Sequence, residues 1–135
     1  MPNRKPARQR DKAKRKTPMT GLAQRRGRRA EFFAALYLRL KGYRIMARNV
    51  RLPSGEIDLV ARRGRLLIFV EVKYRAHIFI AKNAVSRRQW QRIERAAAQF
   101  VGARPRLHHM VWRFDVLAMA PYRLPRHGQN MWHAS

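Results

Sequence analysis

Acidic residues and cysteine are the scarce components of this 135-residue sequence. It has no cysteine, which excludes disulfides, thiolate metal ligands and cysteine nucleophiles and agrees with a reducing cytoplasm as its compartment. Seven Asp and Glu stand against 32 Lys and Arg, so the formal net charge is +25. Such a charge far exceeds what solubility requires, which makes nucleic acid the expected partner and predicts salt-dependent binding.

Long apolar runs and several familiar catalytic motifs are also absent. The longest apolar stretches, such as residues 66–70, fall far short of the roughly 20 residues of a membrane span. The N-terminus is basic but has no apolar segment behind it, so we expect no secretory signal, while a basic organellar transit peptide stays open. There is no glycine-rich phosphate loop, no serine nucleophile elbow and no His-Glu-x-x-His motif. We expect no membrane partner.

Charge and hydrophobic pattern divide the chain into three parts. Residues 1–20 have no hydrophobic periodicity and are predicted to form a disordered basic arm, which either holds phosphates or only keeps the protein soluble. Residues 21–119 contain the patterned segments of one domain. Residues 120–135 contain two prolines and a glycine, and they are predicted to form an irregular tail. Residues 30–135 still carry a net charge of +14, so the basic field is not confined to the arm.

The periodicity within the domain predicts two helices and four strands. A helix is expected at 22–41, with Thr20 as N-cap, Gly42 as C-cap and an apolar stripe of Ala30, Phe33, Ala34, Tyr37 and Leu38. A second helix is expected at 87–101, capped by Ser86, with a stripe of Trp90, Ile93, Ala97, Phe100 and Val101. Strands are expected at 43–49, 56–61, 65–73 and 110–119, the middle two forming a hairpin.

Three of the seven acids lie in that apolar hairpin, namely Glu56, Asp58 and Glu71, with Lys73 two residues further on. A carboxylate costs several kcal/mol to bury unless it is paired or bound to a metal. Alternation along the strands predicts Glu56 and Asp58 on one face of the sheet, opposite to Ile57 and Leu59. It likewise groups Phe69, Glu71 and Lys73 on one face. Adjacent strands lie about 4.8 Å apart, so Asp58 and Glu71 can share one cation.

These residue types match the needs of metal-dependent phosphodiester cleavage. Mg²⁺, or Mn²⁺ in its place, is held by one or two carboxylates plus waters, a role that fits Asp58 and Glu71, with Glu31 as a further ligand, direct or through water. Lys73 can orient water or stabilise the developing charge. The alternative is a cross-strand ion-pair cluster. For a lone Glu-x-Lys we would favour that alternative, but the added Asp58 in an acid-poor chain favours the metal site. The arginines expected to contact nucleic acid are Arg62, Arg63, Arg75, Arg88, Arg92 and Arg95.

Other polar and aromatic residues are predicted to be structural. Asp115, in the sequence Arg113-Phe114-Asp115-Val116, is expected to pair with arginine. Most aromatic residues are expected in the core, with Trp132 in the tail as the candidate for base stacking.

Several motifs recur in an order that resembles the uncharacterised bacterial YraN family. They are Gly27-x-x-x-Glu31, Gly42-Tyr43, Arg48-Asn49, Gly55-Glu56-Ile57-Asp58-Leu59, Phe69-Val70-Glu71-Val72-Lys73-x-Arg75, Arg92-Ile93 and Arg113-Phe114-Asp115-Val116. That family is similar to PD-(D/E)xK nucleases and archaeal Holliday junction resolvases. The resemblance implies a restriction-endonuclease-like α/β fold, a mixed sheet flanked by helices, with Glu31, Asp58, Glu71 and Lys73 as catalytic residues. The chain departs from the pattern at Ile57, where a proline is expected, and at Gln89, where a lysine is common.

The hypothesis from sequence is therefore a metal-dependent endonuclease acting on DNA, branched or damaged DNA included. A non-catalytic nucleic-acid-binding protein on the same fold is the first alternative, and a basic RNA- or ribosome-associated protein is the second. DNA is expected in preference to RNA, and a homodimer stays open.

Overall fold

The computed structural model describes residues 21–78 and 84–133. The predicted basic arm at 1–20 and the predicted N-cap Thr20 lie outside the described residues. None of the helices within the described ranges has the length and apolar character needed to cross a membrane.

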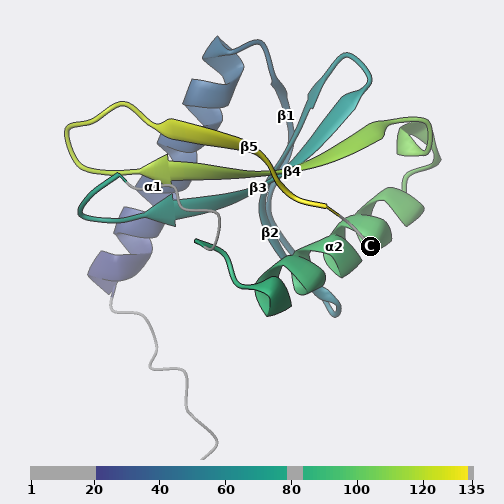
Figure 1. Cartoon of the computed structure of the whole chain (residues 1–135), viewed down its shortest axis with the longest axis horizontal. Coiled ribbons are helices and arrows are strands. Elements are labelled where there is room, and N and C mark those ends of the chain that lie inside the picture. Colours follow the sequence, from purple (N-terminus) through teal and green to yellow (C-terminus); the bar gives the residue numbers. More distant parts are fainter. Residues whose placement is uncertain (1–20, 79–83, 134–135) are drawn as a thin grey trace, which may run out of the picture.

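The chain forms a mixed sheet with one long helix on each face (Figure 1). The elements in order are α1 (Gly21–Leu40), β1 (Arg44–Leu52), β2 (Gly55–Arg63), β3 (Leu66–Tyr74), α2 (Arg87–Gly102), a 3-10 turn (Pro105–Leu107), β4 (Val111–Met119) and β5 (Arg126–Trp132). The five strands lie in the order β1-β2-β3-β4-β5. Strands β3 and β4 are parallel, and every other neighbouring pair is antiparallel. The predicted α/β class, with a mixed sheet flanked by helices, is confirmed.

Helix α1 ends at a glycine, as the sequence predicts. Gly42 has φ +89°, and the Tyr43 backbone N–H donates to the Leu38 carbonyl at 2.9 Å, which closes the last turn. The buried face of α1 consists mainly of small residues: Ala30, Ala34, Ala35 and Leu38. Phe33 was predicted to share this face, but its side chain is 52% exposed, because the contact with the sheet is centred one position away on Ala34 and Leu38.

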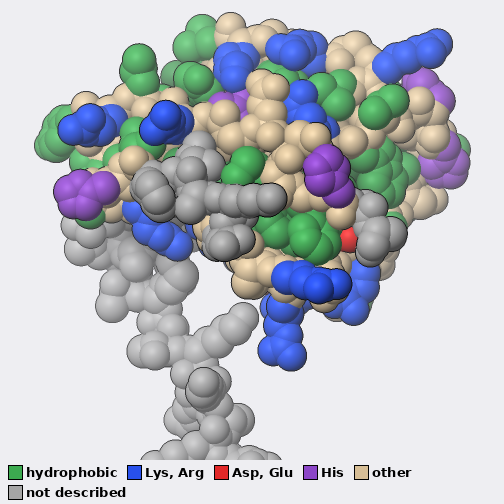
Figure 2. All heavy atoms as spheres, viewed as in Figure 1, with side chains coloured by type: hydrophobic (Ala, Val, Ile, Leu, Met, Phe, Trp, Pro, Cys, Tyr) green, Lys and Arg blue, Asp and Glu red, His purple; other side chains and the backbone are tan. Residues whose placement is uncertain are grey.

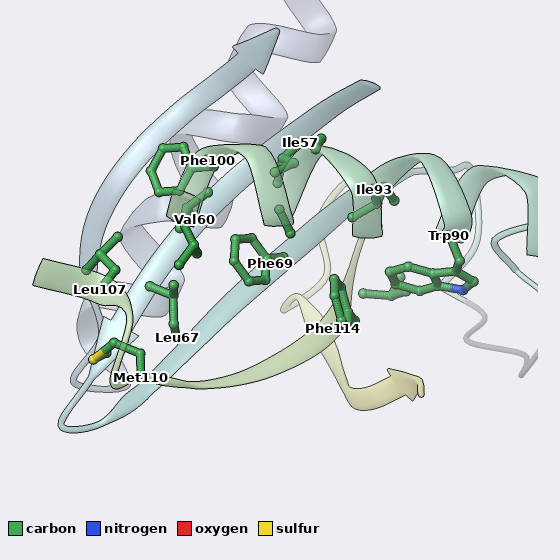
Figure 3. Packing of buried hydrophobic residues seen from close by; sticks show 14 of the residues in the cluster. Ile57, Val60, Leu67, Phe69, Trp90, Ile93, Phe100, Leu107, Met110 and Phe114 are labelled. Carbon is green, nitrogen blue, oxygen red and sulfur yellow. The ribbon is translucent and has the colours of Figure 1, made fainter. Parts of the chain in front are cut away.

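Helix α2 covers the other face of the sheet and starts at a side-chain cap. Ser86 Oγ accepts a hydrogen bond from the Gln89 backbone N–H at 3.1 Å. The predicted stripe is buried, with Trp90, Ile93 and Phe100 pointing toward β2, β3 and β4 (Figure 3). A Cβ on Gly55 would lie 2.6 Å from the Arg92 carbonyl oxygen, so only glycine allows β2 to begin this close to α2.

The prediction of an irregular tail at 120–135 is wrong, because β5 (Arg126–Trp132) pairs antiparallel with β4. Trp132 is partly buried against the core cluster under α2 rather than a free stacking platform. Its ring stacks on Trp90 with 6.4 Å between centroids, and its Nε1 donates to Glu94 Oε2 at 3.0 Å. The prolines and the glycine of this segment led to the prediction of irregular structure. The contacts of Trp132 with Trp90 and Glu94 instead hold the segment in place as a strand.

A buried ion-pair network fastens β5 to β4. Asp115 is fully buried and accepts two hydrogen bonds from Arg113, at 2.8 and 2.7 Å, which confirms the predicted pairing with arginine. His127 Nε2 lies 2.7 Å from Asp115 Oδ2, and Lys41 Nζ lies 2.6 Å from His127 Nδ1. Burial by itself raises the pKa of Asp115, but the hydrogen bonds from His127 and Arg113 outweigh it, and the pKa lies below its ordinary value.

Candidate metal-binding site

Asp58 lies at the point where the two strands of the hairpin separate. The β2–β3 pairing runs from the turn only as far as Leu59 and Val70. One residue further along, the ladder is replaced by a side-chain contact, because the Val72 backbone N–H donates to Asp58 Oδ2 at 2.8 Å. The divergence opens the sheet next to Glu71, the residue that follows Val70 on β3.

The side-chain alternation of β2 changes at this point, so one part of the face assignment was wrong. Ile57 packs in the cluster under α2, whereas Leu59 packs in the cluster under α1. They were predicted on one face. The regular alternation of a strand fails because β2 leaves its β3 partner at Asp58 and turns Ile57 toward α2. Glu56, also predicted beside Asp58, is exposed.

Glu71 and Lys73 both contact Gln89, which lies in the first turn of α2. Glu71 is 8% exposed, and Lys73 Nζ lies 3.3 Å from its Oε1. The Gln89 side-chain Nε2 donates to Glu71 Oε1 at 2.8 Å, and Lys73 Nζ lies 3.5 Å from the side-chain Oε1 of Gln89. Phe69, two residues before Glu71, packs under α2, so the predicted common face of Phe69, Glu71 and Lys73 is confirmed.

The position of Asp58 disfavours its ionised form. Burial raises the pKa of Asp58 most, the negative charge of Glu71 raises it further, and the result is a value of about 7. The hydrogen bond from Val72 and the charge of Lys73 lower the pKa but do not compensate. A carboxylate held in this way is stabilised by an added cation.

Glu31 on α1 lies near this pair without completing a three-acid cluster. Burial raises its pKa first, and the charge of Asp58 contributes in the same direction, while Asn49, Arg51 and Arg48 act against the rise. Over residues 21–78 and 84–133, no three Asp, Glu or His side chains are close enough to hold one metal ion. Asp58 and Glu71 are brought together, and Glu31 is close enough to Asp58 for the charge of Asp58 to raise its pKa.

The donor set of two carboxylates fits a small hard cation. Mg²⁺ prefers oxygen ligands and usually keeps several waters, so two carboxylates are enough to hold it. Burial and the charge of Glu71 raise the pKa of Asp58 in spite of Lys73, so a cation beside Asp58 would favour its ionised form. Thiolate metal sites are excluded by the lack of cysteine.

The predicted nucleic-acid-binding arginines fall into two groups. Arg88, Arg92 and Arg95 are exposed on α2, whose first turn carries Gln89, and Arg75 is exposed just past the end of β3. Arg62 and Arg63 lie at the other end of β2, four and five residues from Asp58, which is roughly 13–17 Å along a strand.

The second group makes local contacts. Arg63 stacks on the Tyr43 ring at 4.5 Å, and Arg62 Nε donates to the Gly64 carbonyl at 3.0 Å. The structure therefore does not bring Arg62 and Arg63 to the carboxylate pair.

Two parts of the site were missed from the sequence. Gln89 was noted only as a departure from a family pattern, although it contacts both Glu71 and Lys73. Arg48 and Arg51 on the edge strand β1 are close enough to Glu31 to lower its pKa, and both are exposed. The sequence pattern of β1 predicts that Arg48 and Arg51 are exposed, but it does not predict that they lie near Glu31.

The surface around these elements is strongly basic. On the face seen in Figure 2, Lys and Arg side chains are spread widely, whereas almost no acidic side chain is visible. Within the described residues, Glu71 and Asp115 are the two buried acids, and each is paired with a basic side chain.

The fold and the site together define a class: an α/β protein with two carboxylates and a lysine where the strands of a hairpin separate. Residues 30–119 match the model of the Uncharacterised protein family UPF0102, and the chain belongs to this family. The match includes Glu31, Asp58, Glu71 and Lys73. The resemblance to a YraN-like family, drawn from the motifs, is confirmed at the level of the family.

Relatives match over most of their length. A UPF0102 protein from Parvibaculum lavamentivorans is 52% identical over 130 residues, covering 95% of this chain and 98% of the relative. One from Paramagnetospirillum magneticum is 53% identical over 114 residues, covering 82% and 88%. One from Caulobacter vibrioides is 47% identical over 110 residues, covering 82% and 88%.

Proposed function

We propose that this protein is a metal-dependent endonuclease that hydrolyses phosphodiester bonds in DNA. The observation that carries the proposal is the placement of Asp58 beside Glu71, with Lys73 Nζ 3.3 Å from the Glu71 carboxylate. In an otherwise basic protein, an acid such as Asp58 that lies half-buried beside a second acid needs a reason, and a shared divalent cation is one.

Each residue then has a chemical role. A bound Mg²⁺ or Mn²⁺ supplies Lewis-acid polarisation of the phosphate and activation of water. Asp58 and Glu71 hold the cation through carboxylate oxygens. Lys73 places a positive charge next to the reacting phosphate, where charge develops in the transition state. Glu31, which lies near Asp58, orients a water in the same site.

The surface charge supports DNA as the substrate. Arg88, Arg92 and Arg95 form an exposed row at positions i, i+4 and i+7 of α2, beginning in the turn that carries Gln89. Such a row can follow a phosphate backbone toward the carboxylate pair. The family resemblance favours branched or damaged DNA as the form of the substrate. We place this activity in the cytoplasm and expect DNA to be cleaved in preference to RNA.

One observation favours a non-catalytic DNA-binding protein instead. Glu71 is fully paired within the chain, with Lys73 at 3.3 Å and Gln89 at 2.8 Å. An ion-pair cluster of this kind can exist for structural reasons alone. Under this alternative the basic surface binds DNA and nothing is cleaved.

A cleavage assay tests the proposal directly. Labelled linear, flapped and four-way DNA, with a single-stranded RNA for comparison, are incubated with Mg²⁺, with Mn²⁺ and with EDTA. We expect metal-dependent cleavage of DNA that is abolished in Asp58→Asn, Glu71→Gln and Lys73→Ala. Glu56→Gln removes a neighbouring exposed acid and serves as the matched control that keeps activity. Binding without cleavage across the whole panel supports the alternative, and cleavage that survives in Asp58→Asn contradicts the proposal.

A further inference from the structure

Most of the large hydrophobic side chains that the described part of the chain exposes are gathered in one groove. The groove has a volume of about 800 Å³ and lies between α1 and the β4–β5 connection. Its exposed apolar residues are Phe33, Leu36, Leu40, Tyr74, Tyr122 and Leu124. Contiguous apolar surface of this kind on a soluble protein marks an interaction site. The groove lies on the α1 side of the sheet, and none of the residues of the carboxylate site lines it.

One wall of the groove has the spacing that a partner helix recognises. Phe33, Leu36 and Leu40 follow one another at intervals of three and four residues along α1. This is the interval of a coiled-coil seam, in which apolar residues of one helix fit between those of another. Leu40 is 80% exposed and Phe33 is 52% exposed, so the seam is open to a partner. The shape of this wall therefore favours a helical occupant.

The opposite wall is a short connection held in an unusual backbone conformation. Tyr122 has φ +58°, a left-handed value that is rare for a large side chain, and the side chain is fully exposed. Leu124, 85% exposed, stands on the same wall between Pro121 and Pro125. Strained residues of this type occur at ligand clamps, where the conformation presents a side chain to a partner.

The charge around the groove distinguishes between candidate occupants. Its lining includes Arg29 and Arg123 and no Asp or Glu among the described residues. A second copy would bring the same two arginines and a further strongly basic surface, which disfavours self-association. A helix with acidic residues flanking its apolar face complements both the arginines and the apolar seam.

We propose that this groove is a docking site for an acidic amphipathic helix of another protein. The apolar face of the helix packs against Phe33, Leu36 and Leu40, Tyr122 and Leu124 cover it from the other side, and its acidic flanks pair with Arg29 and Arg123. The groove is separate from the carboxylate pair. A helix bound there would connect this chain to the other protein without entering the proposed nuclease centre.

A designed peptide tests the proposal on the full-length chain. The probe is a fluorescein-labelled helix of about three heptads with leucine at the seam positions and glutamate elsewhere. One control peptide has lysine in place of glutamate, and another has the acidic composition in scrambled order. Fluorescence anisotropy is expected to show binding of the acidic amphipathic peptide at least tenfold tighter than binding of either control. Equal binding of the scrambled peptide would mean that charge alone attracts it, and that result overturns the proposal.

Variants of both walls locate the binding. Leu36→Glu and Leu124→Glu each place an acid in the groove and are expected to weaken peptide binding at least tenfold. Val111→Glu is the matched control, because Val111 is 63% exposed and lies outside the groove. Circular dichroism confirms that each variant is folded. If Val111→Glu weakens binding as much as Leu36→Glu, the groove is not the site.

Two further outcomes identify a different occupant. Light scattering that shows a dimer in the wild type and a monomer in Leu36→Glu would assign the groove to a second copy of the chain. Peptide binding that appears only after deletion of residues 1–20 would assign it to the chain itself. Either result overturns the proposal of an acidic partner helix.

Discussion

The side-chain amide of Gln89 donates a hydrogen bond of 2.8 Å to Glu71 Oε1. The carbonyl oxygen of the same amide lies 3.5 Å from Lys73 Nζ, so one side chain of α2 contacts both the acid and the base of the Glu-x-Lys motif. Ser86 fixes the position of this contact, because it caps the turn in which Gln89 lies. Helix α2 therefore helps to fix the positions of Glu71 and Lys73 on β3, in addition to the hairpin itself.

Loss of the Gln89 amide is expected to weaken the site without unfolding the domain. Partners that orient a metal ligand typically contribute 10–100-fold to metal affinity or activity. We therefore expect Gln89→Ala to lower metal-dependent cleavage, or Mn²⁺ affinity, by about that factor. Gln91→Ala, an exposed glutamine of the same helix, is the control and should behave as wild type. Equal effects of the two substitutions would show that Gln89 does not orient Glu71.

Asp58→Asn is expected to make the metal-free protein more stable at high pH. The pKa of Asp58 is about 7 in the folded protein against an ordinary value of 3.8. The stability contributed by its protonated form is therefore present below about pH 4 and is lost as the pH rises through 7. In EDTA, the variant should match wild type near pH 4 and exceed it at pH 8 by about 1–3 kcal/mol, allowing for partial exposure.

Denaturant unfolding at pH 4, 6 and 8 measures this difference. A variant that is less stable than wild type at every pH would mean that Asp58 is a structural acid, and the metal hypothesis would lose its electrostatic support.

Asp115→Asn is expected to have the opposite effect on stability. Asp115 is fully buried and pairs with Arg113 and His127, so its neutralisation leaves a largely buried guanidinium without its counter-charge. Breaking a buried pair in this way typically costs about 3–5 kcal/mol. Thermal unfolding at pH 7 should show a large decrease for Asp115→Asn. Val111→Ala on the same strand, an exposed position, should show little change.

The arginines of α2 are expected to dominate DNA binding. Replacing Arg88, Arg92 and Arg95 by alanine removes three phosphate contacts and should reduce the slope of log K against log salt by about 2.7. Replacing Arg62 and Arg63 should change the slope less, since both make local contacts at the far end of β2. Fluorescence anisotropy with duplex DNA at salt concentrations from about 50 to 300 mM measures the slope. A larger effect of the Arg62 and Arg63 pair would place the DNA on the other end of the sheet.

Local sequence signals predicted the two helices and the hairpin because their causes are local. Ser86 and Gly42 act on their own helix ends, and the α2 stripe repeats with the helical period. The proximity of Asp58 and Glu71 was predicted from side-chain alternation, strand spacing and the family resemblance. These features needed no knowledge of distant residues.

The sequence misled where distant residues decide the outcome. Strand β5 forms because His127 reaches Asp115 and Trp132 stacks on Trp90, contacts that no local pattern contains. Ile57 turns toward α2 because β2 separates from β3, which strict alternation does not anticipate. The role of Gln89 depends on where α2 crosses the sheet, so it was visible only in the fold.

Divalent-cation binding at Asp58 and Glu71 is the most direct test of the account. Isothermal titration of Mn²⁺ into the metal-free protein at pH 8, where Asp58 is mostly ionised, measures it without reference to any substrate. The account predicts one site in wild type and in Glu56→Gln, and its loss in Asp58→Asn and Glu71→Gln. Equal Mn²⁺ binding by wild type and Asp58→Asn, or none by wild type, would contradict a metal centre on this hairpin.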